Sequence, residues 1–557
     1  MMKSTAEAQR RRDFLTTAPS HKSLAEEGTP LLWRGAGGEV KYWLIFLLSI
    51  VILAPTFAQK TIKLKHADKS IGRTVGNERQ DWLVGNVVFE QNQTTIYCDS
   101  AKRNKKENAL EAFGNIKITD GDSITITALS LAYDGNKRIA KLRRNVVFNK
   151  LNTATLHTDF LDFDRVRNQA KYFNGGKLVD STNTLTSRKG YYDTRSNMAS
   201  FKTDVVGVSN DSTTLKSDTL QYQTKTKVVY FRDKTVVKDK EGKLATYTSG
   251  FYDTQSKFST ISRGTIETQS YIMKGDNYVI DDKKLFYRAT GDVVMTSKEE
   301  NLIIYSQQSD YHKGQGFTKI YDRCYLAKVD APGDTLFLSA DTLLSIDNKD
   351  PKKKRLLAYH NVKIFKNDMQ GIADSLAYVS IDSMLYFYRN PALWNGDNQM
   401  TADSIRILMR RKTIDRIYMV GNSFVASQDS LKNFNQIKGR LMTSYFRNKK
   451  INRVDVQGNG QSLYYVTEEK DLKDTTGTKV AKIIFLTGLN KIECSNMKIN
   501  FVDGKLNNIT FIKKPDASFI PPHEINEKEA VLPGFNWRIK DRPRRNTVVK
   551  PNTSPSP

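Results

Sequence analysis

Aspartates at a regular spacing are the residues of this sequence whose type could support chemistry. The clearest are Asp218, Asp341, Asp374 and Asp403, each next to Ser or Thr. A row of carboxylates could bind calcium or act in acid–base catalysis, but calcium needs several oxygen ligands converging in one loop. One Asp per unit is more typical of a corner that hydrogen-bonds its own backbone. We therefore predict a structural role for these carboxylates.

The cysteines and histidines show no spacing that indicates a reactive site. Cys98, Cys324 and Cys494 form no CxxC or Cys/His cluster, so neither a zinc site nor a disulfide framework is indicated. The six His residues fall in different units and pair with no Cys or carboxylate at triad spacing. A polysaccharide-processing β-helix would need clustered acidic residues on neighbouring units, and the sequence has no such cluster. We predict no metal, no cofactor and no enzymatic activity.

An internal repeat of about thirty residues must position these aspartates. From Asp99 to Asp403, successive corners lie 28 to 34 residues apart. Apolar or small residues occupy the −3 and −1 positions before each corner and the +2 and +4 positions after it. Apolar and polar residues therefore alternate with a period of two on each side, but the alternation changes parity at the corner, as a bend or bulge would produce. The corners are Asp99, Leu129, Asp159, Arg188, Asp218, Thr248, Asp276, Gln307, Asp341, Asp374 and Asp403, with later copies at Arg440 and Ser495.

A second element recurs halfway between corners, as in Gly85-Asn-Val-Val-Phe and Gly114-Asn-Ile-Lys-Ile. Gly and Asn tolerate the positive φ of a turn, and β-branched and aromatic residues favour the strand that follows. Each unit then consists of strand, corner, strand and turn. We predict an all-β, elongated, repetitive β-jellyroll or β-solenoid of about a dozen ~30-residue rungs, on the order of 55 Å long at ~4.8 Å per rung.

Segments of different composition flank the repeat. Residues 41–58 combine a basic residue, a short apolar run and a small-x-small site after Ala58, the pattern of a signal peptide for export. Residues 1–40 form an unstructured extension, which lies upstream of the true start if translation begins near Val40. Residues 59–79 form a linker, 80–512 the repeat array, and 513–557 a disordered, basic, Pro-rich tail.

The charge of the chain favours acidic partners. The sequence has 87 Lys and Arg against 60 Asp and Glu, a formal charge of +27. An exported protein meets membranes and envelope glycolipids before it meets DNA. We therefore expect no nucleic-acid partner. We expect the chain to lie in the periplasm, either free after cleavage of the signal peptide or associated with the membrane if the signal acts as an anchor.

The repeat units resemble the OstA-like family of lipopolysaccharide transport, whose periplasmic member is of the LptA type. The resemblance rests on units such as Gly85-Asn-Val-Val-Phe leading to Asp99, and Leu215-Lys-Ser-Asp218-Thr-Leu-Gln-Tyr222, over residues 80 to 460. It implies a β-jellyroll whose apolar groove shields the acyl chains of lipid A. It also implies end-to-end contacts through terminal strand edges, either with other jellyroll components of the transport machinery or with a second copy.

The residues agree with this expectation, because inward-facing apolar positions recur from unit to unit. At ~0.8 kcal/mol per buried CH₂, such a lining could hold a multi-acyl lipid, with Lys and Arg at its mouth to pair with phosphates. We expect the groove lining to include Ile96, Ile126, Leu156, Leu215, Leu220, Tyr222, Leu338 and Met400. The alternative is a structural or adhesive cell-surface β-solenoid with a closed core. Neither the particular glycolipid nor the place in the transport chain follows from the sequence.

Overall fold

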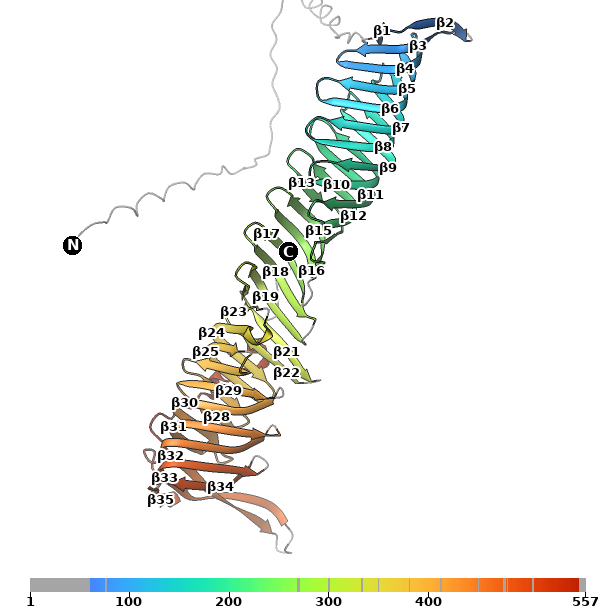
Figure 1. The fold of residues 1–557 in the computed structure, drawn as a ribbon. Coiled ribbons are helices and arrows are strands. Elements are labelled where there is room, and N and C mark those ends of the chain that lie inside the picture. Colours follow the sequence, from blue (N-terminus) through green and yellow to red (C-terminus); the bar gives the residue numbers. More distant parts are fainter. Residues whose placement is uncertain are drawn as a thin grey trace, which may run out of the picture. The chain divides into compact units, whose positions relative to one another are not determined.

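The computed structural model describes residues 61–75, 78–267, 271–298, 301–331, 334–348, 350–379, 381–410, 413–448, 450–473, 477, 479–502 and 505–549. The chain divides into two units, 1–59 and 60–557. The first unit, with the predicted extension and signal peptide, lies outside the described residues. The second is built almost entirely of antiparallel strands, stacked one after another (Figure 1).

The strands of the first half are β1 (Lys63–His66), β2 (Lys69–Val75), β3 (Glu78–Gln91), β4 (Thr94–Asn104), β5 (Ala109–Asp120), β6 (Ile124–Asp134), β7 (Ile139–Lys150), β8 (Ala154–Asp164), β9 (Gln169–Val179), β10 (Asn183–Asp193), β11 (Met198–Ser209), β12 (Thr214–Gln223), β13 (Val228–Phe231), β14 (Thr235–Lys238), β15 (Leu244–Asp253), β16 (Phe258–Glu267) and β17 (Tyr271–Asp281).

The second half comprises β18 (Phe286–Ser297), β19 (Leu302–His312), β20 (Phe317–Tyr321), β21 (Tyr325–Ala331), β22 (Asp334–Ser339), β23 (Thr342–Ile346), η1 (Pro351–Lys353), β24 (Arg355–Lys366), β25 (Met369–Val379), β26 (Met384–Tyr388), β27 (Ala392–Asn395), β28 (Asn398–Thr401), β29 (Ser404–Arg410), β30 (Thr413–Gln428), β31 (Phe434–Arg447), β32 (Lys450–Lys473), β33 (Lys479–Val502), β34 (Lys505–Ile512), β35 (Asp516–Ile520), η2 (Pro522–Glu524), η3 (Ile539–Asp541) and α2 (Arg545–Val548).

Each long strand bends near its middle, so its two ends belong to two layers. In β4 the pairing register shifts between Tyr97 and Ser100, around the predicted corner at Asp99, and β5 shifts beside Gly114 and Asn115. Where the bend is sharper, the strand is divided in two: β21 pairs with β22 in one layer, while β20 pairs with β23 in the other. The predicted change of parity at the corner is confirmed, and the fold is an elongated β-jellyroll.

The Gly-Asn element proved to be a bend rather than a connection between strands. Gly114 and Asn115 have φ values of 74° and 40°, as a turn-forming pair requires, but they lie inside β5. The hairpin turns lie elsewhere, for example at residues 105–108 and 121–123. Each thirty-residue unit therefore contributes two bent strands and adds about 9.6 Å, two strand spacings, instead of one. The predicted length of about 55 Å is thus too short by about a factor of two.

The corner aspartates hold these bends together. Asn115 Nδ2 donates to Asp99 Oδ2 at 3.0 Å, and Asn361 Nδ2 donates to Asp341 at 2.7 Å. A Cβ on Gly114 would lie 2.3 Å from the Asp99 carboxylate, so the close approach requires glycine there. The structural role expected for the aspartates holds at these corners. The carboxylate, however, accepts a hydrogen bond from the facing bend of the next strand instead of from its own backbone.

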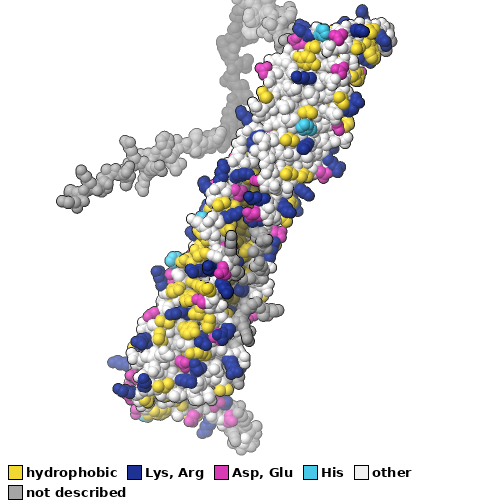
Figure 2. All heavy atoms as spheres, in the orientation of Figure 1, with side chains coloured by type: hydrophobic (Ala, Val, Ile, Leu, Met, Phe, Trp, Pro, Cys, Tyr) yellow, Lys and Arg dark blue, Asp and Glu magenta, His cyan; other side chains and the backbone are white. Residues whose placement is uncertain are grey.

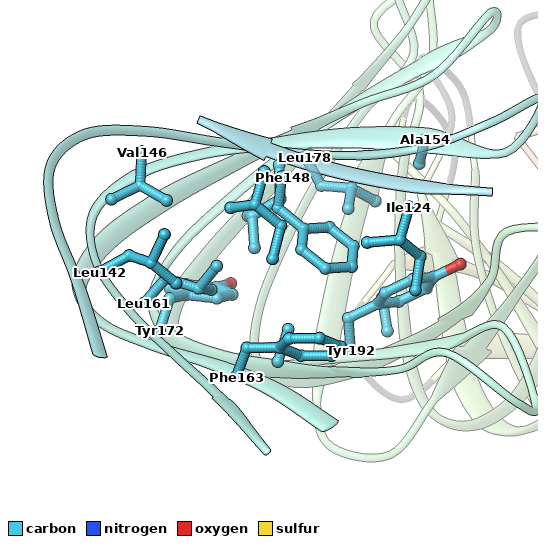
Figure 3. Close-up of a cluster of buried hydrophobic side chains, with 14 of the residues drawn as sticks. Ile124, Leu142, Val146, Phe148, Ala154, Leu161, Phe163, Tyr172, Leu178 and Tyr192 are labelled. Atoms are coloured by element: carbon cyan, nitrogen blue, oxygen red, sulfur yellow. The ribbon is translucent and has the colours of Figure 1, made fainter. Parts of the chain in front are cut away.

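The core lies between the two layers and is filled by side chains of both (Figure 3). Phe148 of β7 projects into it and meets Phe163 and Tyr192 edge-on, with ring centroids 5.8 and 5.9 Å apart. Edge-to-face pairs at this separation add to the free energy gained by burying apolar area. The layers of the first half are thus packed directly against each other.

The prediction of a disordered tail from residue 513 is wrong for residues 513–549. β35 pairs with β33, and the following chain runs back along the C-terminal half of the unit as far as β22 and β24. Leu532 is 2% exposed and Val548 is fully buried. Pro, Lys and Arg gave this segment a composition typical of disorder, but its apolar residues find partners on distant strands.

Candidate functional site

One row of paired residues runs through the inner face of the first layer, from strand to strand. We call it row A, and it contains six of the eight predicted lining residues. Each member pairs with the next across the strand interface. Row A comprises Phe89, Ile96, Ile118, Ile126, Phe148, Leu156, Leu178, Leu185, Gly207, Leu215, Val237, Ala245, Ile266, Met273, Met295, Ile304, Leu326, Leu338, Ile364, Gly371, Leu393 and Met400.

The other two predicted residues lie in the second layer. Leu220 belongs to a parallel row that continues through Phe201 on one side and Phe231 on the other. Tyr222 lies two positions further along β12 and points to the same inner face. The structure therefore places all eight predicted residues on the inner faces of the two layers. Their contact with a lipid stays a prediction.

Row A is closed over its first part. From Phe89 to Leu185 none of its residues is more than 3% exposed. A cavity beside Ile96 and Ile118 has a volume of only about 10 Å³, at the lower limit for a single water molecule. At Ile96, Ile126 and Leu156 the interior is therefore a packed core, not an open groove.

The same row becomes accessible in the middle of the unit. Its members from β12 to β18 are half-buried, although all pack against the core: Leu215, Val237, Ala245, Ile266, Met273 and Met295. We call these six residues the window. They span five strand spacings, about 24 Å. Figure 2 shows hydrophobic side chains exposed along the middle of the unit. After the window, row A is buried again from Ile304 to Met400.

Polar contacts join the two sets of hairpin turns where the edges of the layers meet, opposite the bends. We call this line the seam. It is formed by Gln91 with Gly135, Asp120 with Arg165, Lys150 with Asn197, Asp180 with Lys227, and Asp211 with Lys257. Partners are 44 to 47 residues apart, or about one and a half units.

The seam is most deeply buried at Asp180, just before the window. Its carboxylate is fully buried, and the Lys227 ammonium lies 2.8 Å away; the Tyr222 hydroxyl also donates to it. At the window itself the contact is looser, because the side chains of Asp211 and Lys257 are 42% and 37% exposed. The layers are therefore held together by buried contacts beside the closed core and by solvated ones beside the window.

The surroundings of these carboxylates favour their ionised form. Burial alone would raise the pKa of Asp180, but hydrogen bonds from Lys227, Tyr222 and two backbone amides outweigh it and leave the pKa below its usual value. The pKa of Asp211 is lowered in the same way, against a smaller effect of burial, by Lys257, Ser209 and Thr213.

Acid should weaken the seam. A carboxyl group with a lowered pKa in the folded state contributes its full stabilisation above its unfolded pKa of about 3.9 and loses it as the pH falls through the folded value. We expect acidification from about pH 6 to pH 3 to lower the melting temperature of the wild type more than that of Asp180→Asn. Thermal melts of both across this range test the expectation; parallel curves would contradict it.

Lysines surround the mouth of the window. Lys243 and Lys313 approach Glu241 from two different turns, at 2.5 and 3.7 Å, and Lys257 lies at the seam. All three side chains are about one-third exposed. Basic groups at a groove mouth could be predicted from the sequence in general terms, but the seam could not, because turn residues such as Asp180 and Lys227 have no local pattern.

The remaining candidates for chemistry among the described residues are metal ligands and cysteines. No three His, Cys, Asp or Glu side chains among them come together as metal ligands would. Cys98 is buried, and burial, assisted by the nearby Asp99, raises the pKa of its thiol to about 12, far from that of a nucleophilic cysteine. None of the described helices combines the length and the apolar composition needed to span a membrane.

Residues 59–217 of the chain match a family model described as OstA-like protein. Among solved structures, the chain is similar to LptH of Pseudomonas aeruginosa, described as the LptA-homologous periplasmic component of the conserved lipopolysaccharide transport device. That match is 16% identical, covers 22% of this chain and 83% of the other, and has a TM-score of 0.19, so it adds nothing to the fold derived from the strand register. None of the curated proteins matches the chain. The region matched by the family model includes Ile96, Ile126, Leu156 and Leu215.

Proposed function

We propose that the chain, whose residues 59–217 match a family model described as OstA-like protein, binds lipopolysaccharide in the periplasm and passes it toward the outer membrane. The window is the observation that carries this proposal. It is a continuous apolar strip whose side chains are accessible from outside, between two parts of row A that are buried.

The chemistry around the window suits an amphipathic anionic lipid. Acyl chains entering at Ile266 or Met273 would bury apolar surface at ~25 cal/mol per Å² on both partners. Lys243, Lys257 and Lys313 at the mouth would meet the phosphates in water, where their present partners are exposed carboxylates. Lipid phosphate can compete for such lysines, because exposed ion pairs contribute only about 0–1 kcal/mol.

Transfer from one protein to the next would use the ends of the stack. At the N-terminal end β1 and β2 both pair with β3, and at the other end β34 and β35 both pair with β33. Strand edges of this kind can extend a sheet into a partner. The partner at either end would be another jellyroll component of the transport machinery or a second copy of this chain.

Photocrosslinking in cells tests the lipid-binding role. A photoreactive residue is placed in turn at Leu215 and Ile266 in the window and at Lys216, which neighbours Leu215 but points outward. We expect adducts that react with an antibody to lipopolysaccharide at the first two positions and none at Lys216. An exported, folded protein without adducts at either window position would contradict the proposal.

A structural or adhesive solenoid is the second candidate function. The packed first part of row A supports it, because a filled core from Phe89 to Leu185 leaves no room for a ligand in the present conformation. The same crosslinking experiment separates the two functions. A reactive group at Leu156, in the closed part, should give lipid adducts only if the seam opens during transport.

A further inference from the structure

The last part of the chain lies along the outer face of the C-terminal half. Residues 530–548, which we call the strap, lie along a row of outward-facing residues that pair from strand to strand: Gln370, Trp394, Gln399, Ala426, Gln436 and Leu463. Gln370, Trp394 and Gln399 each lie next to a row A residue, and the other three lie next to Val425, Ile437 and Ser462, which pair onward from Met400, so all six face away from the core. Yet none of them is more than 4% exposed, because the strap covers them.

Two glutamines of this row bind the strap backbone in the same way. Gln436 Nε2 donates to the carbonyl of Ala530 at 2.9 Å, and its Oε1 accepts from the amide of Leu532 at 2.9 Å. Gln399 repeats this with the carbonyl of Asn536 and the amide of Arg538, at 2.7 and 2.6 Å. A side-chain amide that both donates and accepts imitates a strand partner.

The third glutamine continues the series. Gln370 accepts from Nε of Arg542 at 2.8 Å, four residues after Arg538, and so binds a side chain of the strap instead of its backbone. The glutamines stand on every second strand of their layer, so the step of six strap residues from the Gln436 contacts to the Gln399 contacts corresponds to two strand spacings, about 9.6 Å. The regular step indicates a strap docked in a fixed register.

Apolar anchors fix the strap between these polar contacts. Leu532 packs among Phe424, Ala426 and Leu463. The rings of Phe535 and Trp537 both lie 5.1 Å from that of Phe434. Near the end, the Arg545 guanidinium stacks 5.0 Å from the centre of the Phe337 ring. The cluster around Leu532 is separate from the core between the layers.

We propose that this outer face is a peptide-binding site, whose ligand is the chain's own residues 530–548 and whose register is read by Gln370, Gln399 and Gln436. The ligand class is a segment of irregular backbone that offers a carbonyl and an amide two residues apart, repeated after six residues, with a turn between the two repeats and apolar anchors beside them. The site faces away from the interior, so it can be emptied while the strands stay folded, and it does not depend on the proposed lipid-binding role.

Hydrogen exchange followed by mass spectrometry tests the reading of the backbone in the full chain. In the double variant Gln399→Ala/Gln436→Ala, we expect the amides of the segment 530–540 to exchange at least about tenfold faster, because four hydrogen bonds are lost. Strands β26–β31 should keep their protection. The matched control is Gln221→Ala, which removes a glutamine that bonds to Ser200 and Arg232 on a strand remote from the strap. Unchanged exchange in the double variant would overturn the proposal.

A second arm asks whether the face binds the segment in trans. In the full chain with Leu532→Asp and Phe535→Ala, the strap loses its anchors and should leave the face. A labelled peptide of residues 525–549 with the natural sequence should then bind, as fluorescence anisotropy would report, and a scrambled peptide should not. Adding Gln399→Ala and Gln436→Ala to that chain should weaken binding at least about tenfold. Equal binding with and without the glutamines would show that the strap is held by unspecific apolar contact.

Discussion

Replacing Phe148 with Ala is expected to lower the free energy of unfolding by about 3–5 kcal/mol, the range for removing a large aromatic side chain from a packed interior. Phe148 is 1% exposed and contacts aromatic rings of the opposite layer at Phe163 and Tyr192. Its loss leaves a cavity between the two layers. Strand pairing fixes the backbone within each layer, so the site cannot easily collapse. Urea unfolding followed by circular dichroism measures the effect.

The matched control for this prediction is Phe113→Ala. Phe113 lies on the strand β5 but is 45% exposed on the outer side. Its truncation should change stability by no more than about 0.5 kcal/mol, as is usual for surface positions. Similar losses for the two variants would mean that the layers are not packed as described.

The second large effect is expected at the seam. The substitution Lys227→Met should destabilise the protein by about 3–5 kcal/mol, because it leaves the fully buried Asp180 carboxylate without a cation. Lys257→Met removes the corresponding lysine of a solvated pair, and should cost no more than about 1 kcal/mol. Melting temperatures of the two variants compare the two positions directly.

A double variant separates loss of the ion pair from loss of the closed seam. In Asp180→Leu/Lys227→Met both charges are gone, and apolar groups of similar size fill the space, which is often close to neutral for stability. We expect this variant to recover most of the stability lost in Lys227→Met. If both variants melt at the same low temperature, Asp180 is not the group whose burial makes the single substitution costly.

The inner faces could be predicted from the sequence because their signal is local. Alternation around each corner identifies inward positions such as Ile96, Leu215 and Met400, and they do lie in one row. The change of parity at Asp99 also appears as a shift in strand register. These features depend only on neighbouring residues, which the period-two pattern describes.

Features that depend on distant residues were missed. Whether an inward position is closed, like Leu156, or half-buried, like Leu215, depends on how tightly the two layers meet, and the sequence pattern is the same at both. The strap was missed for the same reason: Gln436 is 94 residues from Ala530, and Gln370 is 172 residues from Arg542. A composition rich in Pro and Arg then favoured disorder.

The offset across the seam also sets an order of assembly. Each contact joins residues only 44 to 47 positions apart, so a chain delivered from its N-terminus can close one stretch of seam after another without waiting for its end. The strap is different, because its three glutamine partners precede it by 94 to 172 residues and it is the last described segment to be delivered. It can dock only when strands β22 to β33 are in place. A docked strap therefore marks the folding of strands β22 to β33, which a chain truncated or stalled before the strap cannot display.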